Sequence, residues 1–336
     1  MNWNKGYSAE FLLAVVDPVT WRSMETYEII SGSVSKSDSL LMESADLSMG
    51  RQIPIGETWV RIHLNAKQSG QGVTDPVFTG LTSVPERGWN GNRLTNNIEC
   101  YSVLKPAQDV LLSRGYYVPG GVNGAEAARR LLSVGAAPVS CDDNARKLTD
   151  SIVAEDGETN LSMALKITDA IGWRLRISGD GYIRICPKAN RESSTYDALG
   201  HDAIETEIKD SYDWFSCPNV FRAVADSLIA VARDENPDSP FSIVSRGREI
   251  WMEETNCHLN DNETIAQYAR RRLAEEQSPW RHITYTRRYD PNLVPGDIVR
   301  ISHPAQDIDG LFSVTSQRIE LGYMARTTEE ANYYGR

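Results

Sequence analysis

The sequence has no long hydrophobic run. The longest apolar run near the start of the 336-residue chain covers only residues 11–16. A signal peptide needs about 7–15 apolar residues behind a basic start, and a membrane helix needs about 20. We therefore expect a protein that is made and folded in a cytoplasm, or that leaves by a route without a cleaved signal, and that has no membrane partner.

Paired cysteine motifs are also missing. The five cysteines lie tens of residues apart, and no CxxC or Cys/His zinc spacing occurs. Because their number is odd, at least one has no intramolecular partner. We expect reduced and mostly buried thiols at all five positions, which are Cys100, Cys141, Cys186, Cys217 and Cys257.

The common catalytic motifs are absent as well. The chain has no GxSxG or HExxH, and its nearest approach to a phosphate loop, residues 119–126, lacks the lysine. The histidines occur singly, and we expect surface or strand-face positions for them: His63, His201, His258, His282 and His303. The sequence therefore predicts no enzymatic activity, no cofactor, and no catalytic, cofactor-binding or metal-binding residue.

Two short stretches, residues 178–181 (SGDG) and 307–310 (DIDG), look slightly like calcium loops. A calcium loop needs oxygen ligands over about twelve residues and a closing glutamate. In both stretches the acidic residues stop early, so turns are favoured, and a metal site is the lesser alternative.

Two clusters of charge have a functional and a plain interpretation. The acidic cluster is either a set of catalytic carboxylates or, as we favour, a solvated edge: Asp202, Glu205, Glu207 and Asp210. The basic patch is either a contact for an acidic protein or a helix face paired with Glu275 and Glu276; it comprises Arg270–Arg272, Arg281, Arg287 and Arg288. Nucleic acid is disfavoured as a ligand because the net charge is −11.

The first hundred residues have the pattern of strands. In residues 58–66, apolar side chains such as Val60, Ile62 and Leu64 alternate with exposed types, which is typical of a half-buried strand. Similar pieces occur at 10–16, 27–34, 39–47, 77–84 and 97–103. Short strands with regular turns predict a small antiparallel barrel or sandwich, which we assign to residues 1–104.

Residues 105–215 have a different, α+β character. Helices are expected at 106–114, 125–134 and 161–171, the last with Asn160 as N-cap and Gly172 at its end. A hairpin follows, with strands at 173–178 and 182–187 around Gly179-Asp180-Gly181. This helix and hairpin close a small insert or spacer module.

Residues 216–326 again predict a barrel, now with an embedded helix. Strands are expected at 219–225, 228–232, 243–253, 281–289, 293–302 and 310–322. The helix is expected at 259–277, with a capping box formed by Asn260 and Glu263. Residues 327–336 are polar, and we expect a C-terminal tail that is a flexible end or an arm.

The order of these pieces resembles a known family. VFTGLTSV (77–84) ends the first barrel, and IGWRLRISGDGYIRI (171–185) forms the hairpin unit. PNVFRAVA (218–225), NETIAQYARRRLAEEQ (262–277) and DPNLVPGDIVRIS (290–302) follow. Over residues 8–325 this order resembles the tail hub proteins of bacteriophages and related contractile injection systems, which join the tail tube to the puncturing or adhesion device.

The resemblance implies a mainly β fold with two similar β-barrel domains separated by an α+β module. It implies a trimeric ring, in which two barrels per chain face a hexameric tube, while the helix and hairpin unit props the ring and contacts the spike. Implied partners are further copies of the chain, tail tube or distal tail proteins, the tape measure protein, and spike or tail-fibre proteins. The implied location is the virion tail, assembled in the bacterial host cytoplasm. Three chains of charge −11 would give an acidic lumen through which DNA passes without specific binding.

Two other functions stay open. A carbohydrate or cell-wall binding module at the tail tip could use some of the eight tryptophans and fourteen tyrosines for sugar stacking. A cell-wall hydrolase would depend on carboxylates such as Asp202, Glu205 or Glu207.

Overall fold

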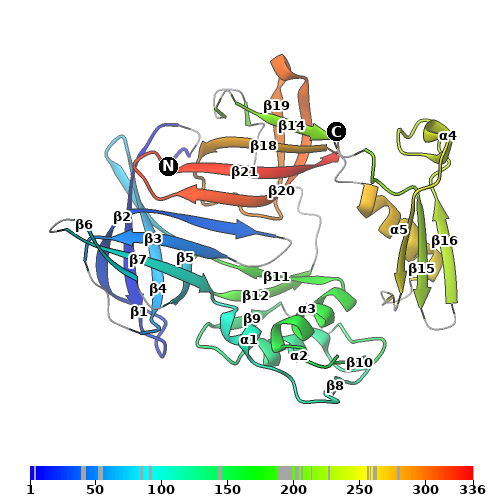
Figure 1. Cartoon of the computed structure of the whole chain (residues 1–336), viewed down its shortest axis with the longest axis horizontal. Coiled ribbons are helices and arrows are strands. Elements are labelled where there is room, and N and C mark those ends of the chain that lie inside the picture. Colours follow the sequence, from blue (N-terminus) through cyan, green and yellow to red (C-terminus); the bar gives the residue numbers. More distant parts are fainter. Residues whose placement is uncertain are drawn as a thin grey trace.

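The chain is mainly β with an α+β insert, as the sequence predicts (Figure 1). The computed structural model describes residues 1–335 except 4, 39–42, 52–55, 84–85, 91–92, 143–145, 188–198, 201–203, 206, 213, 226–227, 256, 258, 260–262 and 278–280. A 13-stranded sheet holds most of its strands, and within the described part no helix is long and apolar enough to span a membrane.

The N-terminal strands close into a ring. They are β1 (Ser8–Val16), β2 (Ser23–Ser37), β3 (Ser44–Met49), β4 (Trp59–Gln68), β5 (Gln71–Thr82) and β7 (Arg93–Ser102), and β6 (Glu86–Asn90) pairs only with β7. The order is β1-β4-β5-β7-β3-β2, and β1 also pairs with β2. The inward face predicted for β4 is confirmed, because Val60, Ile62 and Leu64 are fully buried in the core of this ring.

A second set of strands continues the same sheet. These strands are β18 (Arg281–Arg288), β19 (Ile298–His303), β20 (Ile308–Glu320) and β21 (Arg326–Gly335), with the short 3-10 helix η2 (Pro304–Gln306) before β20. Strand β20 pairs with β19, with β21 and with β2 of the first ring. The two cores therefore lie side by side along one continuous sheet (Figure 1).

Residues 199–212 contribute two short strands to this second set. Strand β13 (Leu199–Gly200) pairs with β19, and β14 (Lys209–Tyr212) pairs with β18. Between them Ile204 bridges Arg287 and is buried with Val299 and Phe312. The segment thus pairs with both outer strands of this set, β18 and β19, and we call the set together with this segment the second ring.

The expectation of a C-terminal tail over residues 327–336 is wrong. Strand β21 runs through these residues between β18 and β20, and Thr327, Glu329 and Ala331 are fully buried. A polar composition predicts an exposed tail, but Glu329 points inward and is neutralised there by Arg287, whose Nη2 lies 2.7 Å from Glu329 Oε1.

The insert packs its helices against a hairpin. Its elements are α1 (Lys105–Asp109), β8 (Tyr117–Val118), α2 (Gly124–Leu132), β9 (Val139–Cys141), β10 (Ile152–Val153), α3 (Asn160–Ala170), β11 (Trp173–Ile177) and β12 (Ile183–Pro187). Gly172, at φ +67°, ends α3 as predicted. The N-cap is Thr159 and not Asn160: the Thr159 hydroxyl accepts from the Ser162 N–H, whereas the Asn160 amide is buried and donates to the Leu131 carbonyl.

Residues 217–277 form a unit with a core of its own. Strands β15 (Val220–Ala225), β16 (Leu228–Arg233) and β17 (Trp251–Thr255) make a sheet that α5 (Ile265–Gln277) covers through Tyr268 and Leu273. Figure 1 shows this unit apart from the rings. In the described residues its strands pair with none of the large sheet, so the helix is not embedded in the barrel expected over residues 216–326.

Two local predictions in this unit need correction. Part of the strand expected at 243–253 is the short helix α4 (Ile243–Arg246), which Ser242 caps and Gly247 ends at φ +64°. The predicted N-cap Asn260 lies outside the described residues. The reciprocal bonds of a capping box join Thr264 and Gln267 instead, so α5 begins four residues later than that box predicted.

Candidate functional site

The hairpin of the insert ends in a tight turn at residues 178–181. Gly181 has φ +80°, which favours glycine, and the Ser178 hydroxyl accepts from the Tyr182 N–H. The same hydroxyl donates to the Asp180 carboxylate. The turn predicted from the Asp-Gly pair is therefore confirmed, and its side chains serve the turn itself.

This turn binds the first ring through its backbone. The carbonyl of Asp180 accepts from Trp21 Nε1 at 2.9 Å and from Arg61 Nη2 at 2.8 Å. The Thr79 hydroxyl donates to the Gly179 carbonyl at 2.8 Å. A Cβ on Gly179 would lie 1.8 Å from the Pro76 carbonyl oxygen, so only glycine allows this approach.

The stem of the hairpin binds the second ring. Arg176 Nη2 lies 2.7 Å from the buried carboxylate of Asp297, in the loop that leads into β19. Arg174 donates to the Gly296 carbonyl at 3.4 Å and lies 3.7 Å from Asp38 of β2's C-terminal end. One hairpin thus joins both rings at their common boundary.

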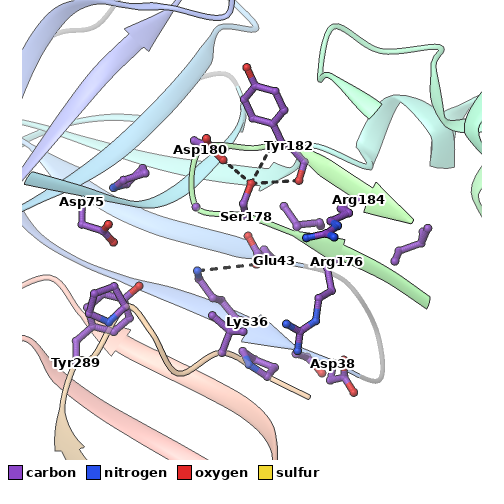
Figure 2. Close-up of a pocket in the computed structure, with 18 of the residues that line it drawn as sticks. Lys36, Asp38, Glu43, Asp75, Arg176, Ser178, Asp180, Tyr182, Arg184 and Tyr289 are labelled. Carbon is purple, nitrogen blue, oxygen red and sulfur yellow. Dashed lines mark hydrogen bonds and ion pairs between the residues drawn. The ribbon is translucent and has the colours of Figure 1, made fainter. Parts of the chain in front are cut away.

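A cleft of about 620 Å³ remains between the hairpin, strands β2 and β5, and the loop after β18 (Figure 2). Its apolar wall includes Leu175, Pro76, Pro291 and the aromatic residues Tyr182 and Tyr289. Its charged lining comprises Lys36, Asp38, Glu43, Asp75, Arg176, Asp180 and Arg184.

The inner wall of the cleft holds a buried pair of charges. Lys36 Nζ lies 4.0 Å from Glu43 Oε1, and both residues are more than nine-tenths buried. Glu43 Oε2 has no hydrogen-bond partner among the described residues. Burial raises the pKa of Glu43 against the opposing effect of Lys36, and burial likewise raises the pKa of the half-buried Asp75.

The predicted acidic cluster does not gather into a site. Glu205 forms a two-pronged ion pair with Arg326, and Asp210 forms another with Arg281. Glu207 is exposed, and Asp202 lies outside the described residues. Hydrogen bonding to Arg326 lowers the pKa of Glu205, which disfavours the protonated form that a general acid needs.

The predicted basic patch is divided between two units. On α5, Arg271 binds Glu263 and Glu275, and Arg272 binds Glu254, Glu275 and Glu276, so the predicted pairing of this helix face is confirmed. The other arginines belong to β18. Arg281 binds Asp210, Arg287 binds Glu329, and Arg288 donates to the Tyr7 carbonyl.

The remaining candidates take structural positions. At residues 307–310, only Asp307 forms the predicted turn, at φ +55° and with its carbonyl accepting from Arg281, whereas residues 308–310 begin strand β20. Three histidines lie in strands β4, β18 and β19: His63, His282 and His303; His201 and His258 lie outside the described residues. In the described part none of the five cysteines forms a disulfide, and three are buried. In the described part no group of three or more His, Cys, Asp or Glu could hold a metal ion.

No sequence pattern marks the cleft. Its inner charges, Lys36, Glu43 and Asp75, come from three separate segments of the first ring, and no motif links them. The one available signal was Lys36, which is two residues from buried Val34 and therefore on the inward face of its strand.

Comparisons with known proteins identify the fold. No family model and no curated protein matches the chain. Among solved structures, the tail protein from Neisseria meningitidis MC58 matches with a TM-score of 0.72 and 16% identity, over 98% of this chain and 97% of that one. The 43 kDa tail protein of prophage MuSo2 from Shewanella oneidensis matches at 0.67 and 14%, over 96% and 98%. Prophage tail protein gp18 from Listeria monocytogenes EGD-e matches at 0.57 and 12%, over 97% and 95%.

At the level of the fold, the resemblance predicted from the order of elements is confirmed. The chain has the fold of these phage tail proteins along almost its whole length.

Proposed function

We propose that this protein is a structural hub of the tail tip or baseplate of a phage or phage-like particle. In this proposal it forms a trimeric ring that joins a hexameric tail tube to the central spike or adhesion device. The near full-length likeness to prophage tail proteins supports a role in a tail. The hub role and the trimer are the parts that need a test.

One observation supports the hub role above the others: each chain carries two rings of strands within one sheet. The junction is the antiparallel pairing of β2 with β20, which sets Val34 opposite Ile319. Three chains arranged around an axis would offer two rings each to the six subunits of a tube. A rigid junction keeps the two rings at a constant spacing, which such a match requires.

The insert supports the same proposal as a brace. Its hairpin binds the first ring through Asp180 and the second ring through Asp297, so it resists bending at the junction. We propose that the helical side of the insert faces a neighbouring tail protein, such as the spike.

We further propose that the protein is not an enzyme. Of the carboxylates on which a hydrolase would depend, Glu205 is held in an ion pair by Arg326. Among the described residues, exposed Trp89 lies on β6 of the first ring, whereas exposed Trp214, which contacts Phe241, and exposed Trp251 lie at the unit of residues 217–277. Tail tube, distal tail, tape measure and fibre proteins are the proposed partners. DNA is proposed to pass the ring's lumen without specific binding, because the net charge of −11 repels it.

The first experiment is the solution mass by light scattering coupled to gel filtration. The monomer is 37.5 kDa, and the hub proposal expects about three times this mass, alone or after addition of the tail tube protein of the same particle. A monomer under both conditions would contradict the proposal. A wall-fragment pull-down and a clearing assay are the controls, since a binding module retains such fragments and a hydrolase degrades them.

A further inference from the structure

The cleft beside the hairpin contains more negative charge than it pairs. Three of its seven charged side chains bind partners that do not line the cleft: Asp38 binds Arg174, Arg176 binds Asp297 and Arg184 binds Asp142. The other four are Lys36, Glu43, Asp75 and Asp180. One cation therefore stands against three carboxylates, and the cleft is left with a negative balance.

Glu43 lies deepest among these carboxylates and lacks a donor. The residue is 8% exposed, and its Oε2 has no hydrogen-bond partner in the part of the chain that the structure describes. An unsatisfied buried acceptor of this kind is costly, and an ionised one is more costly still. A ligand that donates a hydrogen bond here would remove that penalty.

Lys36 does not meet this need. Its ammonium group lies 4.0 Å from Glu43 Oε1, which is beyond hydrogen-bond distance. The single charge of Lys36 also acts on Asp75. Burial raises the pKa of Asp75, and the nearby carboxylates of Asp180 and Asp290 raise it further. Figure 2 shows the ion pair of Lys36 with Glu43 at the centre of the cleft and Asp75 to its left.

The shape and walls of the cleft suit an organic group better than a bare ion. Its volume of about 620 Å³ lies within the usual range for small-molecule pockets. Tyr289, Pro76 and Pro291 provide apolar and aromatic surface, on which an alkyl stem can pack and a cation can be stabilised by a ring face. No set of three metal-ligating side chains occurs among the described residues.

We propose that this cleft is a binding site for an organic cation, an ammonium or guanidinium group on an apolar stem, which donates to Glu43 and is balanced by Asp75. The cation has two possible sources, the lysine or arginine side chain of a neighbouring polypeptide or a free amine. The inference rests on the cleft alone and does not depend on the assembly proposed above.

Calorimetric titration of the full-length protein tests this site and its source. The probes are the peptide acetyl-Gly-Arg-Gly-amide, the free amine agmatine, and the same peptide with neutral citrulline in place of arginine. We expect at least one cationic probe to bind with a Kd of about 1 mM or tighter, and the citrulline peptide to bind about tenfold more weakly or less. Binding of the arginine peptide alone identifies a polypeptide source, and equal or tighter binding of agmatine identifies a free amine.

Two substitutions and one control place the ligand in the cleft. Glu43→Gln keeps the shape of the side chain and removes the charge, and we expect about a tenfold weaker Kd for the cationic probe. Asp75→Asn should weaken binding in the same direction and serves if the first variant does not fold. Asp309→Asn removes an exposed carboxylate of β20 outside the cleft, and should leave the Kd unchanged. The proposal is overturned if neither cationic probe binds, if citrulline binds equally well, or if the control loses as much affinity as the cleft variants.

Discussion

The contact of Gly179 with the first ring gives a sharp test of how the hairpin is held. Gly179→Ala would put a Cβ 1.8 Å from the Pro76 carbonyl oxygen, and a neighbour made of backbone cannot rotate away. The turn must then withdraw from the ring. Withdrawal weakens three hydrogen bonds, which join Thr79 to the Gly179 carbonyl and both Trp21 and Arg61 to the Asp180 carbonyl.

The size of the effect follows from these contacts. Overpacking of a close contact costs about 1–3 kcal/mol, and each lost hydrogen bond costs about 0.5–1.5 kcal/mol. Because withdrawal relieves part of the clash, we expect the free energy of unfolding to fall by about 2–4 kcal/mol in total. The matched control is Gly322→Ala, where an added Cβ meets no atom within 4 Å, and a change within about 0.5 kcal/mol is expected.

Urea denaturation measures the free energy of unfolding, and hydrogen exchange over residues 173–187 reports detachment of the hairpin. Faster exchange in this segment is expected for Gly179→Ala and not for the control. If Gly179→Ala matches the wild type in both measurements, the hairpin is not held by this contact and our account of the junction fails.

Three further predictions concern the other parts of the chain. Glu329→Gln leaves the charge of Arg287 buried and unpaired inside the second ring, so we expect urea denaturation to detect a loss of about 3–5 kcal/mol; a loss below about 1 kcal/mol would contradict a buried pair. Hydrogen bonding to Arg129 lowers the pKa of Glu126 from 4.5 to about 2. The stabilising effect of the ionised Glu126 is therefore complete above pH 4.5 and is lost as the pH falls toward 2. The difference in unfolding free energy between wild type and Glu126→Gln should shrink over this interval, and a constant difference would refute the assignment. Thr159→Ala removes the N-cap of α3 and should cost about 1 kcal/mol by the same denaturation assay, whereas no change would mean that another group caps the helix.

Sequence pattern predicted the local elements of this protein well where short-range physics decides them. The alternation in β4 marked its buried face, and the paired strands β15 and β16 were expected within a residue or two of their bounds. Gly172 and the Gly-Asp-Gly turn marked the end of α3 and the following hairpin. These features depend on neighbouring residues along the chain, so the sequence displays them directly.

Prediction failed where a polar residue is satisfied by a distant partner. The polar composition of β21 predicts a tail. The buried ion pair of Glu329 with Arg287 explains why such a strand can be internal. The acidic cluster at residues 202–210 similarly predicts a solvated edge, although Ile204 within it is buried in the second ring. The N-cap was assigned one residue too late, since Asn160 serves the Leu131 carbonyl of another helix.

By itself the sequence determined most of the strands and helices, their order along the chain and the absence of known catalytic motifs, because each of these is a property of local pattern. Only the tertiary structure decided which strands share a sheet, that residues 217–277 have a core of their own, and that one hairpin joins both rings. The cleft is also a product of the tertiary structure. Lys36, Asp75 and Tyr289 are far apart in the chain, and strand pairing and hairpin docking alone bring them together around one cavity.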